Sequence, residues 1–324
     1  MAQLPTKEGS LPFEVPGRKD ISCSTYYKIV GDLSSGAPPL VVAHGGPGAG
    51  HDYLLSWADL WPQYGLPVVF YDQIGCGSST HLPDTLGDTS LWQESTFVAE
   101  LNNLIDHLNL RDGPGFHLLG QSWGGMFGVT FASGRPRGLQ KLVLANALAS
   151  KELSSQGYQL RIQEMPPDKR EVLEDCLKKE DFESPAYQGA MMAFYKLYLC
   201  RDDPFPPSLL PSFKNIGEAK AVNQTMNGRS VLIGDGSMKD WTSIPGLPQV
   251  TAPTLVYNGE FDSSHDVAQV PFFELIPRVR WITFAGGSHM CHLESGGLKE
   301  KVFKTVGDFL TQGQDRQGKP AVQG

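Results

Sequence analysis

The chain has 324 residues, and its 27 basic and 35 acidic side chains give a formal net charge of −8 with histidine neutral. This length supports one large folded unit or two small ones and excludes a peptide-sized module held together by disulfides. The acidic balance gives no electrostatic reason to bind nucleic acid or an anionic membrane, so we expect a small-molecule or short-peptide substrate.

The sequence contains five widely spaced cysteines and no C-x-x-C pair, the cysteines being Cys23, Cys76, Cys176, Cys200 and Cys291. An odd, scattered set predicts neither a disulfide framework nor a zinc site. The first twenty residues lack the basic and apolar regions of a secretory signal, and eighteen apolar residues never run together. We therefore expect a cytoplasmic protein without a membrane span.

Short apolar runs rich in β-branched residues alternate with amphipathic stretches in the first half of the chain. Buried strands are predicted at residues 25–30, 40–43, 68–71, 116–120 and 142–145. Apolar residues at three- and four-residue intervals predict a helix over residues 94–109. Strands that alternate with helices predict an α/β fold, with a mainly parallel sheet covered by helices on both faces.

The strand pattern disappears after about residue 148 and resumes after residue 250. Two more strands are then predicted at residues 254–257 and 280–284, followed by a helix near residues 298–310. This arrangement indicates a helical insertion inside one α/β sheet. The predicted units are an α/β core at residues 1–148 and 251–311, a helical cap at residues 149–250 and a flexible tail at residues 312–324.

A run rich in methionine and aromatic residues, at 191–198, lies inside the predicted cap. Such a run more often packs in a core than lines a binding site. Because the inner face of a cap is where a substrate would lie, we keep Tyr195 as a candidate substrate contact.

The segment Gly120-Gln121-Ser122-Trp123-Gly124-Gly125 follows a predicted strand and precedes a helix-like stretch. This is a G-x-S-x-G motif in the context that its chemistry requires. A sharp turn from strand to helix exposes the serine hydroxyl, and the neighbouring residues must be small because larger side chains would collide. The motif predicts Ser122 as a nucleophile.

Serine needs a base, and in this arrangement the acid and the histidine follow the nucleophile in the chain. His289 lies in a glycine-rich loop just after a predicted strand and is the candidate base, with His292 as its competitor. Asp262 lies in the loop after the preceding strand and is the candidate acid, with Glu260 and Asp266 as alternatives. Asp262 would orient the imidazole of His289 and stabilise its protonated form.

Acyl transfer also needs two N–H donors for the developing oxyanion. Trp123, directly after the nucleophile, would supply one. The other would come from the loop that begins at His44, where Pro47 has no N–H and Gly46 is therefore the candidate. Gly45 would let the backbone approach the substrate closely, so we count it as a candidate substrate contact.

Three motifs in chain order resemble the proline iminopeptidase family of α/β-hydrolases. They are His44-Gly45-Gly46-Pro47-Gly48, Asp72-Gln73-Ile74-Gly75-Cys76-Gly77-Ser78-Ser79 and the segment at residues 120–125. The resemblance covers about residues 25–310. It implies a serine enzyme with a helical cap that removes an N-terminal residue, often proline, from short peptides or amides. The positions matching the family triad are Ser122, Asp262 and His289, and those matching its oxyanion donors are Gly46 and Trp123.

The sequence departs from this family where a substrate's free ammonium group would be bound. Family aminopeptidases carry a cap glutamate at the position that Val231 occupies here. Some members also carry an acid directly after the triad aspartate, at the position of Ser263. A buried ammonium group without a counter-charge is costly. Asp235, Asp202 and Glu218 are the candidate substitutes, and Val231 and Asp235 are kept as candidate substrate contacts.

The sequence is compatible with three functions. The leading one is an aminopeptidase or amino-acid amidase that works through an acyl-enzyme and needs no metal or other cofactor. The alternative suggested by Val231 is an esterase or lactonase for a neutral hydrophobic metabolite. A ligand-binding receptor on the same fold is the alternative outside enzymes, because fold does not imply function.

Overall fold

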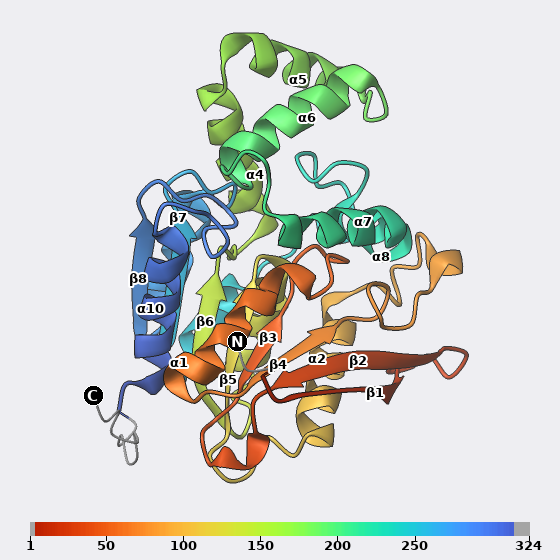
Figure 1. Ribbon diagram of the computed structural model, residues 1–324. Helices are drawn as coiled ribbons and strands as arrows, with labels where there is room; N and C mark the ends of the chain where they lie inside the picture. The colour runs from red at the N-terminus through yellow and green to blue at the C-terminus, as the bar shows by residue number, and fades with distance from the viewer. Residues whose placement is uncertain (1–3, 314–324) are drawn as a thin grey trace.

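The computed structural model describes residues 4–313, which form an α/β fold around one eight-stranded sheet (Figure 1). The strand order is β1-β2-β4-β3-β5-β6-β7-β8; the β1–β2 and β2–β4 pairs are antiparallel, and the remaining pairs are parallel. The predicted mainly parallel sheet is confirmed. The strands are β1 (Thr6–Glu14), β2 (Ser22–Val30), β3 (Leu40–Ala43), β4 (Val68–Asp72), β5 (Phe116–Gln121), β6 (Leu139–Ala145), β7 (Thr254–Gly259) and β8 (Val279–Phe284).

Ten α-helices and six short 3-10 helices occur within the described residues. The α-helices are α1 (Leu60–Tyr64), α2 (Glu94–His107), α3 (Trp123–Ser133), α4 (Lys151–Glu164), α5 (Pro167–Lys179), α6 (Pro185–Tyr198), α7 (Leu210–Glu218), α8 (Lys220–Asn227), α9 (Val270–Leu275) and α10 (Leu298–Thr311). The 3-10 helices are η1 (Leu33–Ser35), η2 (Asp52–Asp59), η3 (Pro83–Thr85), η4 (Pro207–Leu209), η5 (Ile244–Gln249) and η6 (Asp266–Ala268).

Side chains of the central strands alternate between two apolar cores, one on each face of the sheet. In β3, Val41 and Ala43 pack with the core to which α2, α3 and α9 contribute. Leu40 and Val42 pack on the opposite face, in the core to which α1 and α10 contribute. Because both faces are covered, this strand is a continuous apolar run, which is why the sequence predicts it so directly.

Strand β1 is absent from the sequence predictions. It pairs with β2 along all nine of its residues at the edge of the sheet. Only Leu11 and Phe13 in β1 are buried, and the other residues are exposed or partly exposed. A strand with one neighbour and few buried side chains shows little alternation of apolar and polar residues, so its sequence does not predict it.

Helices α4–α8 form an insertion between β6 and β7, and we use this name for them below. In Figure 1 its helices α5 and α6 lie farthest from the sheet, whereas α7 and α8 lie close to the core. The insertion leaves and re-enters the core at one point. There, Ser150 pairs with Thr242, Lys151 N donates to Trp241 O (3.0 Å) and Ser243 N donates to the carbonyl of residue 149 (2.9 Å).

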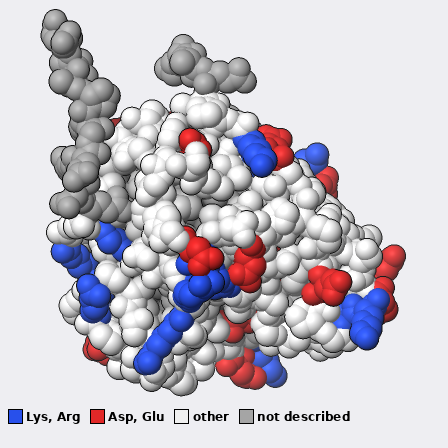
Figure 2. Space-filling view, turned by 90° about the horizontal axis from the view of Figure 1, so that it is seen from below, with Lys and Arg blue, Asp and Glu red and all other residues white. Residues whose placement is uncertain are grey.

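Charged side chains of both signs share the surface. Figure 2 views the molecule from below the orientation of Figure 1, and there Lys and Arg lie beside Asp and Glu with uncharged surface between them. In the part of the chain that the structure describes, no helix combines the length and the apolar character needed to cross a membrane. The predicted tail at residues 312–324 lies almost wholly outside the described residues.

Candidate active site

Ser122 lies at the sharp turn between strand β5 and helix α3. Its backbone has φ 53° and ψ −119°, a combination that is rare for residues other than glycine. Ser122 N donates to Ala145 O (2.9 Å), and Ser122 O accepts the first helical bonds, from Gly125 N (2.9 Å) and Met126 N (3.1 Å). The serine is partly exposed at this turn, as a nucleophile must be.

Close backbone contacts explain the glycines of this turn. A Cβ atom on Gly120 would lie 2.3 Å from Gly124 O, and one on Gly124 would lie 2.1 Å from Ala43 O. A Cβ atom on Gly125 would lie 2.5 Å from the Cβ atom of Ala147. Such distances are too short for any side chain, so the packing of β3, β5 and α3 allows only glycine at these positions.

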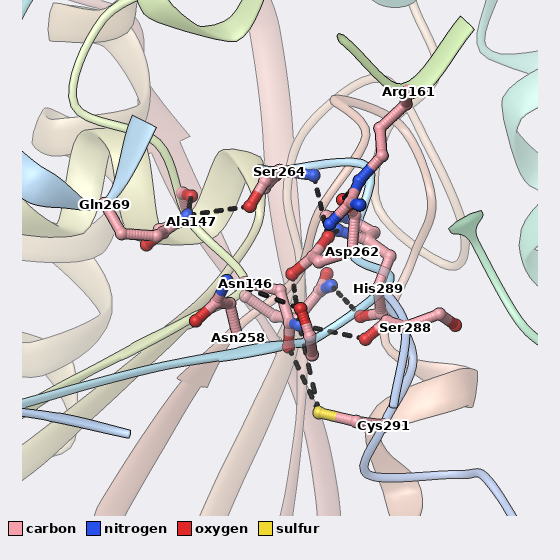
Figure 3. A network of polar contacts seen from close by, with 12 residues as sticks. Asn146, Ala147, Arg161, Asn258, Asp262, Ser264, Gln269, Ser288, His289 and Cys291 are labelled. Atoms are coloured by element: carbon pink, nitrogen blue, oxygen red, sulfur yellow. Dashed lines mark hydrogen bonds and ion pairs between the residues drawn. The ribbon is translucent and has the colours of Figure 1, made fainter. Parts of the chain in front are cut away.

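Asp262 and His289 lie in the loops after β7 and β8 and are joined by a hydrogen bond (Figure 3). The distance from His289 Nδ1 to Asp262 Oδ1 is 2.7 Å, and both side chains are buried. Asp262 also accepts from Asn146 Nδ2 (2.6 Å) and from Ser264 N (2.7 Å). Because a carboxylate only accepts, the imidazole proton lies on Nδ1, which leaves Nε2 as the acceptor that a general base needs.

The three alternative residues make other contacts. His292 is buried against Trp57, burial lowers its pKa to about 3, and its Nε2 donates to Tyr53 O (3.3 Å). Glu260 accepts from the N–H of residue 286 (2.8 Å), and Asp266 accepts from the amide of residue 258 (2.6 Å). The pair that the structure brings into contact is therefore Asp262 and His289.

The nucleophile turn and the histidine loop meet at the carboxyl edge of the parallel strands. Gln121, the last residue of β5, donates its Nε2 to His289 O (3.4 Å), and Ser122 follows it directly. In parallel α/β sheets, binding sites form at this edge, where the loops after neighbouring strands converge.

The loop after β3 lies against the nucleophile turn. A Cβ atom on Gly45 would lie 3.1 Å from the Cβ atom of Ser122. Gly45 N donates to the hydroxyl of Tyr53 (2.7 Å), which in turn donates to Gln121 Oε1 (2.5 Å). Tyr53 is buried, and these two bonds hold the loop backbone beside the end of β5.

Gly46 N, one of the two predicted oxyanion donors, belongs to the peptide plane that carries the carbonyl of Gly45. This carbonyl accepts from His44 Nδ1 (2.9 Å) and from Ala49 N (3.3 Å), which fixes the plane. Trp123 N, the other predicted donor, belongs to the first residue of α3, where the helix dipole favours negative charge. The structure thus fixes the peptide plane of Gly46 N and places Trp123 N at the start of α3, while their role as oxyanion donors stays a prediction.

A buried polar chain connects this loop to the nucleophile turn. Gln73 N donates to His44 Nε2 (3.0 Å), and Gln73 Nε2 donates to His44 O (2.9 Å). Trp123 Nε1 donates to Gln73 Oε1 (2.9 Å). Burial lowers the pKa of His44 to about 4, so the ring stays neutral and its Nε2 remains an acceptor at physiological pH.

Known proteins resemble this chain in sequence and in fold. Residues 38–296 match the family model described as alpha/beta hydrolase fold. The proline iminopeptidase of Lactiplantibacillus plantarum is 35% identical over 83% of this chain and 92% of its own length, and that of Clostridioides difficile is 31% identical over 94% and 97%. The chain belongs to the proline iminopeptidase family of α/β-hydrolases. The resemblance read from its three motifs is confirmed.

Two crystal structures agree closely with this fold. VinJ matches with a TM-score of 0.86 at 38% identity, over 94% of this chain and 98% of that chain. The proline iminopeptidase of Mycobacterium smegmatis matches with a TM-score of 0.84 at 34% identity, over the same shares of the two chains. The predicted α/β-hydrolase fold is confirmed.

Val231 and Ser263, where the sequence departs from the resemblance, make apolar and backbone contacts. Val231 packs against an apolar cluster of the insertion that includes Tyr158 and Ile162. Ser263 is buried, and its N–H donates to Tyr198 O (3.0 Å). Neither position supplies a carboxylate to a substrate ammonium group.

The candidate substitute acids already have partners. Asp235 forms an ion pair with Arg229 (3.3 Å) on the exposed surface. Asp202 accepts from the backbone and side chain of Ser295 (3.0 and 2.9 Å), and Glu218 is exposed, 3.8 Å from a lysine one turn earlier. Tyr195, the remaining candidate contact, lies with its ring centroid 6.2 Å from that of the phenylalanine at position 213.

Sequence reasoning missed two residues that hold the acid loop. Asn146, directly after β6, has a positive φ of 51° and donates to Asp262, as described above. Arg161, on α4, donates from Nε to Asp262 O (2.9 Å) and from a terminal nitrogen to Glu260 O (2.6 Å). Figure 3 shows the guanidinium reaching this loop from the insertion. The only feature of the sequence that could have indicated this role is the position of Asn146 directly after a buried strand.

No cluster of three or more His, Cys, Asp or Glu side chains is arranged to hold a metal ion among residues 4–313. The five cysteines are free and buried. Burial raises the pKa of Cys23 to about 11 and that of Cys200 to about 12, which keeps these thiols protonated and unreactive.

Proposed function

We propose that this α/β-hydrolase is a serine enzyme that releases an N-terminal, prolyl-type residue from a short peptide or an amino-acid amide through an acyl-enzyme. Its relatives are named proline iminopeptidases, and they cover most of the chain. The observation that carries the proposal is the buried contact between Asp262 and His289, together with Ser122 on its strained turn at the same edge of the sheet.

In the proposed mechanism, Ser122 Oγ attacks the scissile carbonyl while His289 Nε2 takes its proton. The N–H groups of Gly46 and Trp123 stabilise the oxyanion, each by about 3 kcal/mol in sites of this kind. His289 then returns the proton to the leaving amine, the C–N bond breaks, and water activated by the same imidazole hydrolyses the ester on Ser122. Asp262 keeps the imidazole in the required tautomer and stabilises its charged form.

Replacement of Ser122 with alanine tests the assignment. We expect kcat on a hydrolysed arylamide or aryl ester to fall on the order of 10⁶-fold, because the nucleophile is lost while the fold is kept. Ser133→Ala is the matched control, since Ser133 ends the same helix and its hydroxyl donates to a backbone carbonyl (2.7 Å). Activity above about 1% of wild type in Ser122→Ala would exclude this serine as the nucleophile.

A specific observation favours a second candidate, an esterase or lactonase for a neutral substrate. Val231 packs among apolar side chains where family aminopeptidases carry an acid, and Asp235 is paired with Arg229. The deciding experiment compares kcat/KM for a prolyl arylamide with a free amine, its N-acylated counterpart and a neutral aryl ester. A preference of about 100-fold for the free amine, or roughly 2.7 kcal/mol, supports the aminopeptidase. A preferred ester with no gain from the amine supports the esterase.

The remaining alternative, a ligand-binding receptor on this fold, makes a distinct prediction. A receptor without catalysis would leave Ser122 unlabelled by a fluorophosphonate probe, whereas an active triad gives stoichiometric labelling that the Ser122→Ala variant loses. The probe needs no knowledge of the substrate.

We also infer that residues 149–250 act as a cap over the site, with residues 1–148 and 251–311 as the core. The departure of α4–α8 from the core between β6 and β7 supports this division. The free, buried cysteines support a reducing compartment, so we propose that the enzyme acts in the cytoplasm on a small or peptide substrate.

A further inference from the structure

The insertion supplies side-chain amides to the backbone of the loop that carries Gly46. Asn227 Nδ2 donates to Gly46 O (3.3 Å), and Asn223 Nδ2 donates to Pro47 O (2.8 Å). Asn215 Nδ2 donates to Ala49 O (3.0 Å). Three carbonyls within four residues of the loop are therefore bound by asparagines from α7 and α8, the two insertion helices that lie nearest the core in Figure 1.

Asn223 and Asn227 belong to one face of α8. They are four residues apart, and Ala219, which precedes Asn223 by four residues, packs against the same loop. A Cβ atom on Gly48 would lie 2.9 Å from the Cβ atom of Ala219. This face of α8 thus follows the loop with one apolar contact and two amide donors.

The loop needs such support because its backbone is intrinsically free. Gly46 has φ +116°, a region that residues with a side chain rarely adopt, and glycine populates many other conformations at little cost. The carbonyl of residue 45 is fixed by His44 and Ala49, as described above. Asn227 and Asn223 bind the next two carbonyls, so the peptide planes on both sides of Gly46 are held.

A buried lysine orients one of these amides. Lys151 Nζ lies 3.5 Å from Asn227 Oδ1, and the lysine is only 5% exposed. A donor on the oxygen side of an amide turns its NH₂ group to the opposite side, here towards Gly46 O. Lys151, Asn227 and Gly46 therefore form a chain that runs from the start of α4 to the oxyanion loop.

We propose that Asn223 and Asn227 are positioning residues that hold the Gly46–Pro47 backbone so that Gly46 N–H points at the developing oxyanion. They act through the loop and do not touch the reacting atoms. The inference rests on the proposed function, since it assumes that Gly46 is an oxyanion donor. It makes the position of α8 part of the catalytic geometry.

The test replaces each asparagine with aspartate, which keeps the shape but puts a carboxylate oxygen against the loop carbonyl. We expect Asn223→Asp and Asn227→Asp each to lower kcat about 10- to 100-fold and to change KM less than about 3-fold, because oxyanion stabilisation acts on the transition state. Asn103→Asp is the matched control. Asn103 Nδ2 also donates to a proline carbonyl, at position 12, at 2.8 Å, but on α2, and its kcat is expected to match wild type.

A second readout separates positioning from a general structural effect. A boronic acid forms a tetrahedral adduct with the serine that occupies the oxyanion hole, so its Ki should rise by the same factor as kcat falls. Binding of the reaction product should change little. Lys151→Met removes the donor that orients the Asn227 amide and leaves Asn223 untouched. It is expected to lower kcat about 3- to 10-fold, and it replaces the aspartate variants in the test if one of them fails to fold.

Unchanged kcat and boronate Ki in the asparagine variants, relative to Asn103→Asp, would overturn the inference, and so would a loss confined to KM. Failure of the proposed function is recognised separately, by wild-type protein that the fluorophosphonate probe does not label at Ser122. Normal labelling together with unaffected asparagine variants would leave the triad intact and remove the positioning role alone.

Discussion

Asp262 is the residue on which the proposed base depends, and its carboxylate has three donors. His289, Asn146 and the N–H of Ser264 each lie 2.6 to 2.7 Å from one of its oxygens. With the carboxylate buried, these bonds replace water and fix the direction in which it meets the imidazole. The donor from Asn146 comes from a residue with a positive φ, which glycine also adopts without strain.

Asn146→Gly removes this donor while keeping the backbone conformation. We expect kcat/KM to fall about 10- to 100-fold, because a hydrogen bond to a charged group contributes roughly 1.5–3 kcal/mol. The control is Asn109→Gly, which makes the same exchange at another positive φ, 54°, at an exposed residue in the turn after α2. Equal activity of the two variants in steady-state assays would show that Asn146 does not support Asp262.

The element that shapes the site is the strand–turn–helix unit of β5 and α3. Its glycines differ in what surrounds them. A Cβ atom on Gly124 would collide with Ala43 O at 2.1 Å, whereas one on Gly128 would meet Leu118 Cδ2 at an ordinary 3.6 Å. Both residues lie in the same helix, so they separate the effect of crowding from the effect of helix propensity.

Opposite stability changes are expected from alanine at these two positions. Gly128→Ala should raise the free energy of unfolding by about 0.5–1 kcal/mol, because alanine favours the helix and restricts the unfolded chain. Gly124→Ala should lower it by about 2–3 kcal/mol through overpacking against β3. Urea unfolding followed by circular dichroism measures both, and a stable Gly124→Ala protein would contradict the packing described here.

Across the whole molecule, burial keeps several titratable groups neutral. It lowers the pKa of His44 to about 4 and those of His117 and His292 to about 3. It raises the pKa of Glu100 to about 8, although hydrogen bonds from Thr25 and from the backbone act in the opposite direction. At pH values between these pKa values and the ordinary ones, the native and unfolded chains bind different numbers of protons.

The sign of the resulting pH dependence follows from these shifts. The three histidines contribute stability above about pH 6.5, and it is lost as the pH falls towards 3–4, since the unfolded chain takes up protons that the native chain refuses. Glu100 changes stability in the opposite sense between about pH 4.5 and 8. Over pH 4.5–6.5 the three histidines outnumber Glu100, so the free energy of unfolding should decrease as the pH falls.

Urea unfolding at a series of pH values between 4.5 and 6.5 measures this slope. His117→Leu should make this pH dependence shallower, because one of the three histidines is gone. His107→Leu, at an exposed position at the end of α2, is the matched surface control for this exchange. Identical slopes in wild type and His117→Leu would mean that His117 titrates in the native protein as it does when unfolded.

How far the sequence predicts this molecule depends on what each residue packs against. The continuous apolar run at 40–43 predicts β3 because both faces of the sheet are covered there. The edge strand β1 is not predicted, because most of its side chains are exposed or partly exposed. The order of Ser122, Asp262 and His289 in the chain predicts loops at one edge of the sheet. The structure brings the last two into contact, while their catalytic roles stay predictions.

The supporting residues could not be predicted because their contacts join distant segments. Asn146 and Arg161 reach the Asp262 loop across more than 100 positions. In the sequence, nothing distinguishes Asn223 and Asn227 from other polar residues of a helix. Their role becomes visible only in the contacts of α8 with the loop of Gly46. A sequence without aligned relatives gives no pairing information for such contacts, and the chemistry of an asparagine alone suggests no role.

The single crossing point of the insertion has a consequence for engineering. Because Ser150 pairs with Thr242 where the chain leaves and re-enters the core, the two ends of α4–α8 are already side by side. A helical segment of different length can be transplanted between them without moving β6 or β7, which pair directly. Such a chimera would keep the sheet, but it would inherit a working catalyst only if the graft also returned two amides to the loop at Gly46 and a guanidinium to the loop at Asp262. A working transplant in this enzyme therefore has to include the contacts between the insertion and these two core loops.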